Sequence, residues 1–407
     1  MSSETRARIY QLKALTDLWT GSVILEERNG QIKEKTGPDR LITTGLLGSI
    51  RWWFEVLVRG LGGSACDPTD TKCEGRNHCV VCELFGCTGW ARKFRFEVLD
   101  KDCNIRETKN NARTNISPQI KKDDEFSLRF TPLRPILVEE WALLDATLRL
   151  IAEYGAIGGK TVLKPTDELA VANVALSEIN ESLKVNNKTV GSPLKQHNQI
   201  IKVGGQRVNS VQELENQLQG KEVGSPLTIT VKRNSSETQI DGWVGKKHHQ
   251  DYGLVEMVTS RQFAETRRDD LEKYLSKWRK VNHGEFAWAS LQHFWCVNGK
   301  YLARQQNGNS SSFNDVIGRP KPKQQSGQND SWIAGRRPDR RNNVEAESKK
   351  VFSFKNPART FGFVKPGLID FNAMKQCLTK AWGQNGWDFL TGDKIIDQLF
   401  SRKEGRS

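Results

Sequence analysis

The chain has 407 residues, which is too long for one small domain and predicts two or three folding units. With 36% hydrophobic residues, 27% charged residues and a net charge of +14, it is expected to have a polar, cationic surface that suits nucleic acid or an acidic membrane face. It has no apolar run of about eighteen residues and no hydrophobic signal core at the N-terminus, so a membrane partner is disfavoured and a cytoplasmic location is expected.

Alternating polarity and an apolar helical face predict the first elements. Residues 7–15 (ARIYQLKAL) alternate apolar and polar side chains, which indicates a half-buried strand. A Gly-, Pro- and charge-rich loop follows at about 21–39. A helix capped by Thr43 or Thr44 is expected next, because apolar residues recur at helical spacing as far as the glycines at 60–63.

Two more strands and a helix complete the first third of the chain. Residues 93–99 (KFRFEVL) and 126–130 alternate as strands, and the polar, basic segment at 108–124 between them is expected to form a hairpin. A helix is predicted from about Glu139 to Tyr154, with acidic residues at its start. The order strand, helix, strand, strand, helix is typical of a ferredoxin-like (RRM-type) sheet with helices on one face, so the predicted fold class is α+β.

A unit of different composition runs from about Val185 to Ile240. A Gly204–Gly205 turn precedes helical spacing at 211–218 and an alternating strand. Residues 191–234 resemble the second half of a bacterial PDZ domain of the protease-associated type, so an inserted PDZ-like α/β module is expected at 169–246. The resemblance implies peptide capture by strand addition, although the glycine-hydrophobic loop that binds a peptide carboxylate in that family has no counterpart upstream.

The surrounding fold is expected to comprise residues 1–168 and 247–407. A strand at 252–258 and a helix from about Arg261 to Val281 are predicted after the insertion. Residues 303–350 are rich in Gln, Asn, Pro and Arg without periodicity, which predicts a flexible loop.

Five short motifs stand out in the chain outside the insertion. They are LTDLWTG at 15–21, TGLLGSIRWWFE at 44–55, CELFGCTGWARKFRF at 82–96, YGAIGGK at 154–160 and RTFGFVKPG at 359–367. Through these motifs the chain resembles the RAMP superfamily of CRISPR backbone proteins, in particular the first subunit of the Cmr complex (type III-B) and its type III-D relatives.

The resemblance implies an RRM-like RAMP fold and a place near one end of a filament that assembles along a guide RNA. It implies a non-catalytic RNA-binding backbone or capping subunit of a type III effector complex, a ribonucleoprotein of antiviral defence. The expected partners are crRNA, target RNA and the other effector subunits.

Candidate RNA contacts are cations, aromatic residues and glycines in these motifs and in the hairpin. They are Arg51, Trp52, Arg92, Lys93, Arg113, Gly158, Gly159, Lys160, Arg359 and Phe361. Guanidinium groups pair with phosphate, aromatic rings stack on bases, and glycine turns let backbone N–H groups approach phosphate.

Each of these interpretations has a structural alternative. Arg51 lies four residues before Glu55, a spacing that also suits a solvated helical ion pair. Phe94 and Phe96 also fit a core-facing side of their strand, which would leave the neighbouring cations to solubilise its edge.

The hairpin around Arg113 resembles the thumb that such subunits insert into a guide–target duplex.

The cysteines are clustered. Cys66, Cys73, Cys79 and Cys82 are separated by six, five and two residues, and the last pair forms a CxxC motif that suits a tetrahedral zinc site. His78 and Cys87 are spare candidates, and Cys87 is the least expected ligand because it lies inside a glycine motif. The alternative is a group of reduced thiols without an ion.

Two further functions stay open on the sequence. An endoribonuclease would use Asp39 in the loop before the first helix, and an adaptor would recruit a protein through the PDZ-like insertion. His248, His249 and Asp251 are residue types found in metal and nuclease sites, but nothing else in the sequence completes such a site, so a solvated junction is expected there.

Overall fold

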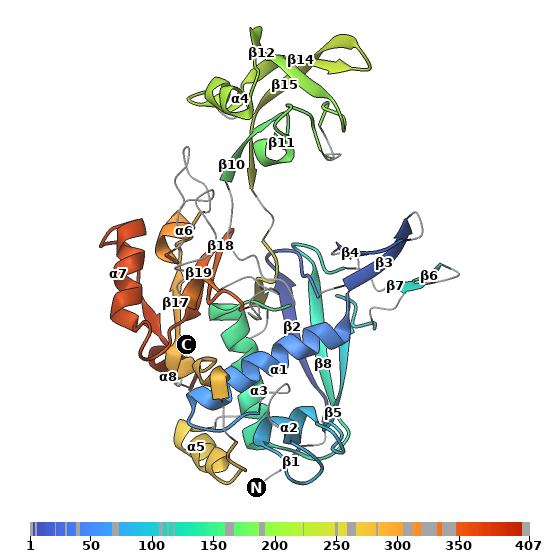
Figure 1. Ribbon diagram of the computed structural model, residues 1–407. Coiled ribbons are helices and arrows are strands. Elements are labelled where there is room, and N and C mark those ends of the chain that lie inside the picture. Colours follow the sequence, from blue (N-terminus) through green and yellow to red (C-terminus); the bar gives the residue numbers. More distant parts are fainter. Residues whose placement is uncertain are drawn as a thin grey trace, which may run out of the picture. The chain divides into compact units, whose positions relative to one another are not determined.

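The computed structural model divides the chain into two compact units (Figure 1). The described residues are 3–4, 6–20, 22–28, 31–37, 41–66, 73–105, 109–111, 114–116, 119–158, 167–186, 192–222, 224–248, 251–258, 266–281, 284–303, 312–318, 332–335 and 347–400. The first unit comprises residues 1–163, 251–302 and 314–407, and the second comprises 164–250 and 303–313. Helices and strands both contribute substantially, which confirms the α+β class.

The first unit contains a complete ferredoxin-like fold. Its four-stranded antiparallel sheet has the order β16-β2-β8-β5, so the fourth strand pairs with the first, the first with the third and the third with the second. Its elements are β2 (Arg8–Ala14), α1 (Thr43–Gly60), β5 (Phe94–Leu99), β8 (Glu125–Pro132), α3 (Val138–Tyr154) and β16 (Val255–Met257). The second unit therefore enters the chain between α3 and the last strand of this sheet.

The same arrangement occurs again toward the C-terminus. The second antiparallel sheet has the order β18-β19-β17-β20, which is the same topology of first, second, third and fourth strands. Its elements are β17 (Phe294–Asn298), α6 (Ser312–Val316), β18 (Val351–Lys355), β19 (Ala358–Phe363), α7 (Phe371–Trp382), β20 (Leu390–Thr391) and the following α8 (Gly392–Phe400).

Helix α1 joins the two sheets into one core. It contacts β5 of the first sheet. Its Trp53 packs against Phe294 and Phe361 of the second sheet, with ring centroids 5.7 and 5.8 Å apart. Buried side chains from both sheets therefore belong to a single hydrophobic cluster.

Among its described residues, the second unit has a six-stranded antiparallel sheet, the α-helix α4 and a separate core. The sheet order is β11-β10-β15-β14-β12-β13. The elements are β10 (Asp167–Val171), β11 (Val174–Ala175), β12 (Gln199–Val203), β13 (Gln206–Arg207), α4 (Val211–Leu218), β14 (Pro226–Arg233) and β15 (Ser236–His248). Ser210 caps α4, since its hydroxyl accepts from the Glu213 N–H at 3.1 Å.

The other elements are short. They are β1 (Ser3–Glu4), β3 (Ser22–Arg28), β4 (Gln31–Gly37), α2 (Val80–Phe85), β6 (Lys109–Asn111), β7 (Thr114–Ile116), β9 (Ile136–Leu137), α5 (Arg268–Ser276) and the 3-10 helices η1 (Leu176–Glu178), η2 (Gly284–Trp288), η3 (Leu291–His293) and η4 (Trp332–Ala334). In the part of the chain that the structure describes, no helix is long and apolar enough to cross a bilayer.

Some elements differ from the sequence-based expectation. The predicted loop at 21–39 contains the β3–β4 hairpin. Helix α1 is not capped by Thr43 or Thr44; instead the N–H of Ile42, its N-cap residue, donates to Thr20 Oγ1 at 2.7 Å. Thr20, which lies between β2 and β3, thus holds the backbone of the residue at which α1 begins.

Two predictions in the C-terminal half also need correction. The helix expected from Arg261 begins at Arg268. Within the loop predicted at 303–350, the described residues include α6 and η4, and Phe313 and Ile333 are buried. These elements are too short for their few apolar side chains to show a helical or strand periodicity in the sequence.

Candidate metal centre and nucleic-acid-facing residues

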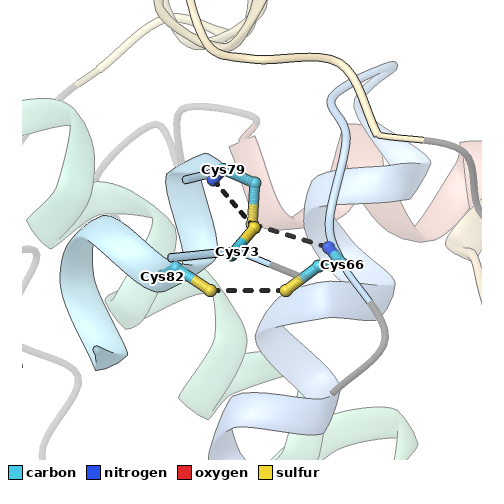
Figure 2. A group of neighbouring side chains, drawn as sticks. All are labelled: Cys66, Cys73, Cys79 and Cys82. Atoms are coloured by element: carbon cyan, nitrogen blue, oxygen red, sulfur yellow. Dashed lines mark hydrogen bonds between the residues drawn. The ribbon is translucent and has the colours of Figure 1, made fainter. Parts of the chain in front are cut away.

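Four cysteines converge beside α1. Cys66 follows the end of that helix, Cys73 precedes a turn, Cys79 is the N-cap of α2 and Cys82 lies within α2. All four are buried, and their sulfur atoms lie within 4.8 Å of one another, with 3.3 Å between those of Cys66 and Cys82 (Figure 2). The predicted convergence of these side chains is confirmed.

The donor set suits a tetrahedral zinc ion. Zn–S bonds of about 2.3 Å place the sulfurs of a regular tetrahedron about 3.8 Å apart, close to the spacing found here. Backbone N–H groups support the sulfurs, from Cys66 to Cys79 Sγ at 3.5 Å and from Cys79 to Cys73 Sγ at 3.4 Å. Hydrogen bonds among the sulfurs lower the pKa of the Cys79 thiol and raise the pKa of the Cys66 and Cys82 thiols. None of the four forms a disulfide, so the residues fit a closed, four-thiolate structural site.

The two spare candidates lie outside this ligand set. His78 directs Nε2 to Glu83 Oε2 at 2.7 Å and Nδ1 to the Gly75 carbonyl oxygen at 2.6 Å, so both ring nitrogens have partners. The imidazole also lies against Trp90, with ring centroids 4.5 Å apart. Cys87 is not part of the sulfur cluster.

Two arginines face the sulfurs. Arg51 directs one terminal nitrogen to Cys82 Sγ at 3.4 Å and to Cys66 Sγ at 3.9 Å. Arg279 lies 4.0 Å from Cys73 Sγ. Sequence reasoning missed Arg279 because 206 positions separate it from Cys73, and no local spacing indicates such a partner.

Arg51 and Trp52, which are candidate RNA contacts, both have partners within the protein. Arg51 Nε donates to Glu55 Oε1 at 3.1 Å, the four-residue pair that was the structural alternative, and 21% of the Arg51 side chain is exposed. Burial alone would lower the pKa of Arg51, but the charges of Glu55 and of the thiolates raise it. Trp52 packs edge-on against Trp53 and Phe363, with centroids 4.9 and 5.7 Å away. RNA contact by either residue stays a prediction.

Lys93 is buried in a polar network inside the protein. Its Nζ lies 2.6 Å from Glu83 Oε1 and 2.8 Å from Glu140 Oε1. The Tyr274 hydroxyl donates to the same Glu140 oxygen at 3.1 Å. Burial raises the pKa of Glu140, against the opposing charge of Lys93. Lys93, which directly precedes β5, therefore connects α2 and α3, and this buried position does not suit contact with RNA.

The aromatic side chains on either side of Arg95 face the core. Phe94 and Phe96 are buried, as in the structural alternative, so their rings do not offer a stacking surface. Arg92 and Arg95 are exposed. Arg95 of β5 and Arg92 just before it therefore present cations to solvent, and Arg92 stays a predicted RNA contact.

Arg359 and Phe361 of β19 are also buried. The guanidinium of Arg359 donates to the carbonyl oxygens of Gly155 at 2.8 Å and of Ala152 at 2.9 Å, where it satisfies the end of α3. Phe361 is 2% exposed. Arg359 thus holds the second sheet against α3, and Phe361 packs against Trp53 of α1 rather than facing solvent.

The glycine loop after α3 is tightly packed at Gly158. This residue has φ +114°, and a Cβ there would lie 2.5 Å from the Trp19 carbonyl oxygen. Its N–H donates to Ser49 Oγ at 3.0 Å, so that donor is used within the fold. Gly159 and Lys160 lie outside the described residues.

The remaining residues singled out from the sequence are Asp39, Arg113, His249 and Asp251. Asp39, Arg113 and His249 lie outside the described residues. Asp251 is buried rather than solvated as expected, and its carboxylate accepts the Lys355 N–H at 2.8 Å. That contact stabilises the start of a turn and gives no sign of a nuclease site.

The first unit thus combines a ferredoxin-like sheet with a cluster of four cysteines. The second unit, a separate small sheet, is inserted in the chain before the last strand of that sheet. Residues 11–163 match the family model of the RAMP superfamily, and residues 166–241 match that of the PDZ domain. The predicted RAMP region and its PDZ-like insertion are thereby confirmed. No curated protein matches the chain.

Among solved structures, the chain is similar to the apo crystal structure of Cmr1 from Pyrococcus furiosus. The sequences are 11% identical, and the alignment covers 70% of this chain and 95% of that chain with a TM-score of 0.23. The similarity of these two regions to the RAMP superfamily and to the PDZ domain depends on the family models and not on this likeness.

Proposed function

We propose that this protein is a non-catalytic RNA-binding backbone or capping subunit of a type III CRISPR effector complex. It would hold crRNA, target RNA or both for antiviral defence, together with the other effector subunits. The observation that carries the proposal is the RAMP superfamily match over residues 11–163, a segment that supplies five of the six elements of a ferredoxin-like fold.

The charge of the chain supports a polyanionic ligand. Its net charge is +14, and Arg76, Arg92, Arg95, Lys121 and Lys122 are exposed in the first unit. Because these groups are cations and the nearby phenylalanines are buried, contacts to phosphate are expected to dominate over base stacking.

Salt dependence of RNA binding tests this proposal. If the purified chain neutralises five phosphates of a labelled single-stranded RNA, its affinity should fall roughly 100-fold between about 50 and 200 mM salt. An oligomer of the same sequence with an uncharged backbone is the control and should not bind. Equal affinity for the RNA at both salt concentrations would contradict the proposal.

Cleavage of target RNA by this subunit is the alternative function. Asp39 would assist attack by the ribose 2′-OH, either by holding a metal ion or by accepting a proton. An assembled complex that carries Asp39→Ala should give unchanged cleavage products if the subunit only binds. Loss of one product with RNA binding intact would favour the enzyme.

For the cysteine centre we propose a structural zinc ion. When bound, it would connect the end of α1 with α2 through sulfur. Elemental analysis of purified protein should find about one zinc per chain, and Cys79→Ser should lose it. Cys103→Ser, at an exposed thiol outside the cluster, is the matched control and should retain the ion. A metal-free wild-type chain would exclude the site.

An adaptor role is supported by the PDZ domain match at 166–241. The edges of its sheet are β11 and β13, which are each two residues long and offer an added peptide strand little backbone to pair with. Strand addition is therefore not favoured. The test compares the protein content of effector complexes assembled with the full chain and with a chain that lacks residues 167–248. Loss of one protein from the second complex would support the adaptor role.

A further inference from the structure

The loop at residues 86–92, called here the Gly86–Arg92 loop, is joined to the cysteine centre through one side chain. The Gly86 carbonyl accepts from one terminal nitrogen of Arg51 at 2.9 Å, while the other faces Cys82 Sγ at 3.4 Å. Arg51 Nε donates to Glu55 on the same helix. One planar guanidinium thus connects α1, a sulfur of the centre and the start of the loop.

Backbone hydrogen bonds join the two ends of the loop to each other and join the loop to the turn that follows Cys73. Cys87 and Trp90 exchange two N–H···O bonds of 3.0 Å. Gly75, in the turn after the second cysteine of the cluster, donates its N–H to the Thr88 carbonyl at 2.9 Å. These bonds make the backbone of the loop an extension of the segment that supplies the thiolates.

The last residue of the loop, Arg92, lies close to the first residue, Gly86. Gly86 has φ +87°, and a Cβ there would lie 2.9 Å from Arg92 N and 3.0 Å from the Trp90 carbonyl oxygen, so only glycine permits this path. Arg134 stacks on the Trp90 ring at 4.5 Å and donates to the Ala91 carbonyl. Arg92 is exposed, so the loop presents its guanidinium to solvent from a fixed backbone.

We propose that the metal centre and Arg51 form a clamp that fixes the Gly86–Arg92 loop, so that RNA binding through Arg92 depends on the bound metal. The RNA part of this inference rests on the function proposed above, and the clamp itself does not. Arg51 is a positioning residue, because its fork reaches a sulfur and a carbonyl together, which the single ammonium of a lysine does not reproduce.

Charge balance supports the clamp. Four thiolates and one divalent zinc ion carry a net formal charge of about −2. Arg51 on one side and Arg279 beside Cys73 bring positive charge to the sulfurs, although Arg51 shares its charge with Glu55. Removal of the ion would free the two cysteine-bearing segments from each other. The Cys82 sulfur that accepts from Arg51 would then no longer be held in place.

The variant Arg51→Lys tests the clamp, with Arg149→Lys as its matched control. The two side chains are 21% and 22% exposed, and each pairs with a glutamate four residues on. Arg149 also donates to a backbone carbonyl, that of Leu399 at 2.6 Å, but it faces that carbonyl and not a cysteine sulfur. Three quantities are measured: zinc content, hydrogen–deuterium exchange of amides 86–92, and affinity for a labelled single-stranded RNA.

Arg51→Lys should keep its zinc, exchange the loop amides roughly tenfold faster and bind the RNA roughly tenfold more weakly, as expected for the loss of about one charged hydrogen bond. Wild-type protein treated with a chelator should show both changes. Arg149→Lys should show neither. Arg92→Ala should weaken RNA binding without a change in zinc content or in loop exchange.

The outcomes separate the clamp from the proposed function. Unchanged exchange of the loop in both Arg51→Lys and the chelated protein overturns the clamp. Weaker RNA binding of Arg51→Lys with unchanged exchange also overturns it, because Arg51 then contacts RNA directly. Faster exchange in a protein whose wild type does not bind RNA supports the clamp and contradicts the RNA function. If chelation unfolds the chain, exchange in zinc-loaded Arg51→Lys decides.

Discussion

Lys93 lies buried between two carboxylates, Glu83 at 2.6 Å and Glu140 at 2.8 Å. Lys93→Met keeps most of the side-chain volume but leaves both carboxylates without their cation. We expect it to lower the free energy of unfolding by about 3–5 kcal/mol, measured by denaturant unfolding. Lys101→Met, at an exposed position, is the control and should change it by less than about 0.5 kcal/mol. Equal effects of the two substitutions would contradict the buried network.

Asp145 in α3 predicts a pH dependence of stability. Burial raises its pKa to about 6, against the opposing charges of Arg149 and Arg8, and its Oδ1 is buried without a hydrogen-bond partner among the described residues. The unfolded value is about 3.9, so between about pH 4 and 6 the folded chain keeps a proton that the unfolded chain releases. The free energy of unfolding therefore falls as pH rises through this window.

The substitution Asp145→Asn isolates this contribution. The variant should gain stability over wild type at about pH 7, by at most about 3 kcal/mol, and much less at about pH 4. Denaturant unfolding of both chains at the two pH values measures the difference, and contributions from all other groups cancel in the comparison. A difference that does not change with pH would show that Asp145 is not the titrating group.

At the scale of elements, helix α1 passes very close to the backbone of Thr20, which lies between β2 and β3. A Cβ at Gly45 would lie 2.5 Å from the Thr20 carbonyl oxygen, whereas a Cβ at Gly48 would meet no atom within 4 Å. We expect Gly45→Ala to lower the free energy of unfolding by about 1–3 kcal/mol through this clash. Gly48→Ala should raise it by about 0.5–1 kcal/mol, because alanine is the better helix former. Thermal unfolding of the two variants should therefore give shifts of opposite sign, and shifts of the same sign would contradict the close approach.

At the scale of the whole molecule, the PDZ-like unit has its own core, and its entry and exit strands are paired. Asp167 in β10 is the partner of His248 in β15, so a short linker can replace residues 167–248. We expect the shortened chain to lose one unfolding transition in calorimetry and to bind single-stranded RNA within about threefold of the full chain. Unfolding of the remaining chain would show that the two units are not independent.

Much of the architecture is readable from local patterns. Alternation at 93–99 and helical spacing at 139–154 predicted a strand and a helix that the structure contains, because both patterns depend on neighbours in the chain. The CxxC pair and its two upstream cysteines indicated a four-thiolate cluster for the same reason. The PDZ-like unit was recognisable because its turn, helix and strand follow one another without interruption.

By itself, then, the sequence determined the fold class, the inserted unit and the four-cysteine cluster. Only the tertiary structure decided which cations are available to a ligand: Lys93 and Arg359 are buried among partners distant in the chain, whereas Arg92 is exposed. It also brought Arg279 to Cys73 across 206 positions. The physical reason is that a charged side chain becomes buried only where distant acceptors compensate its desolvation, and a pattern of neighbouring residues does not contain those acceptors.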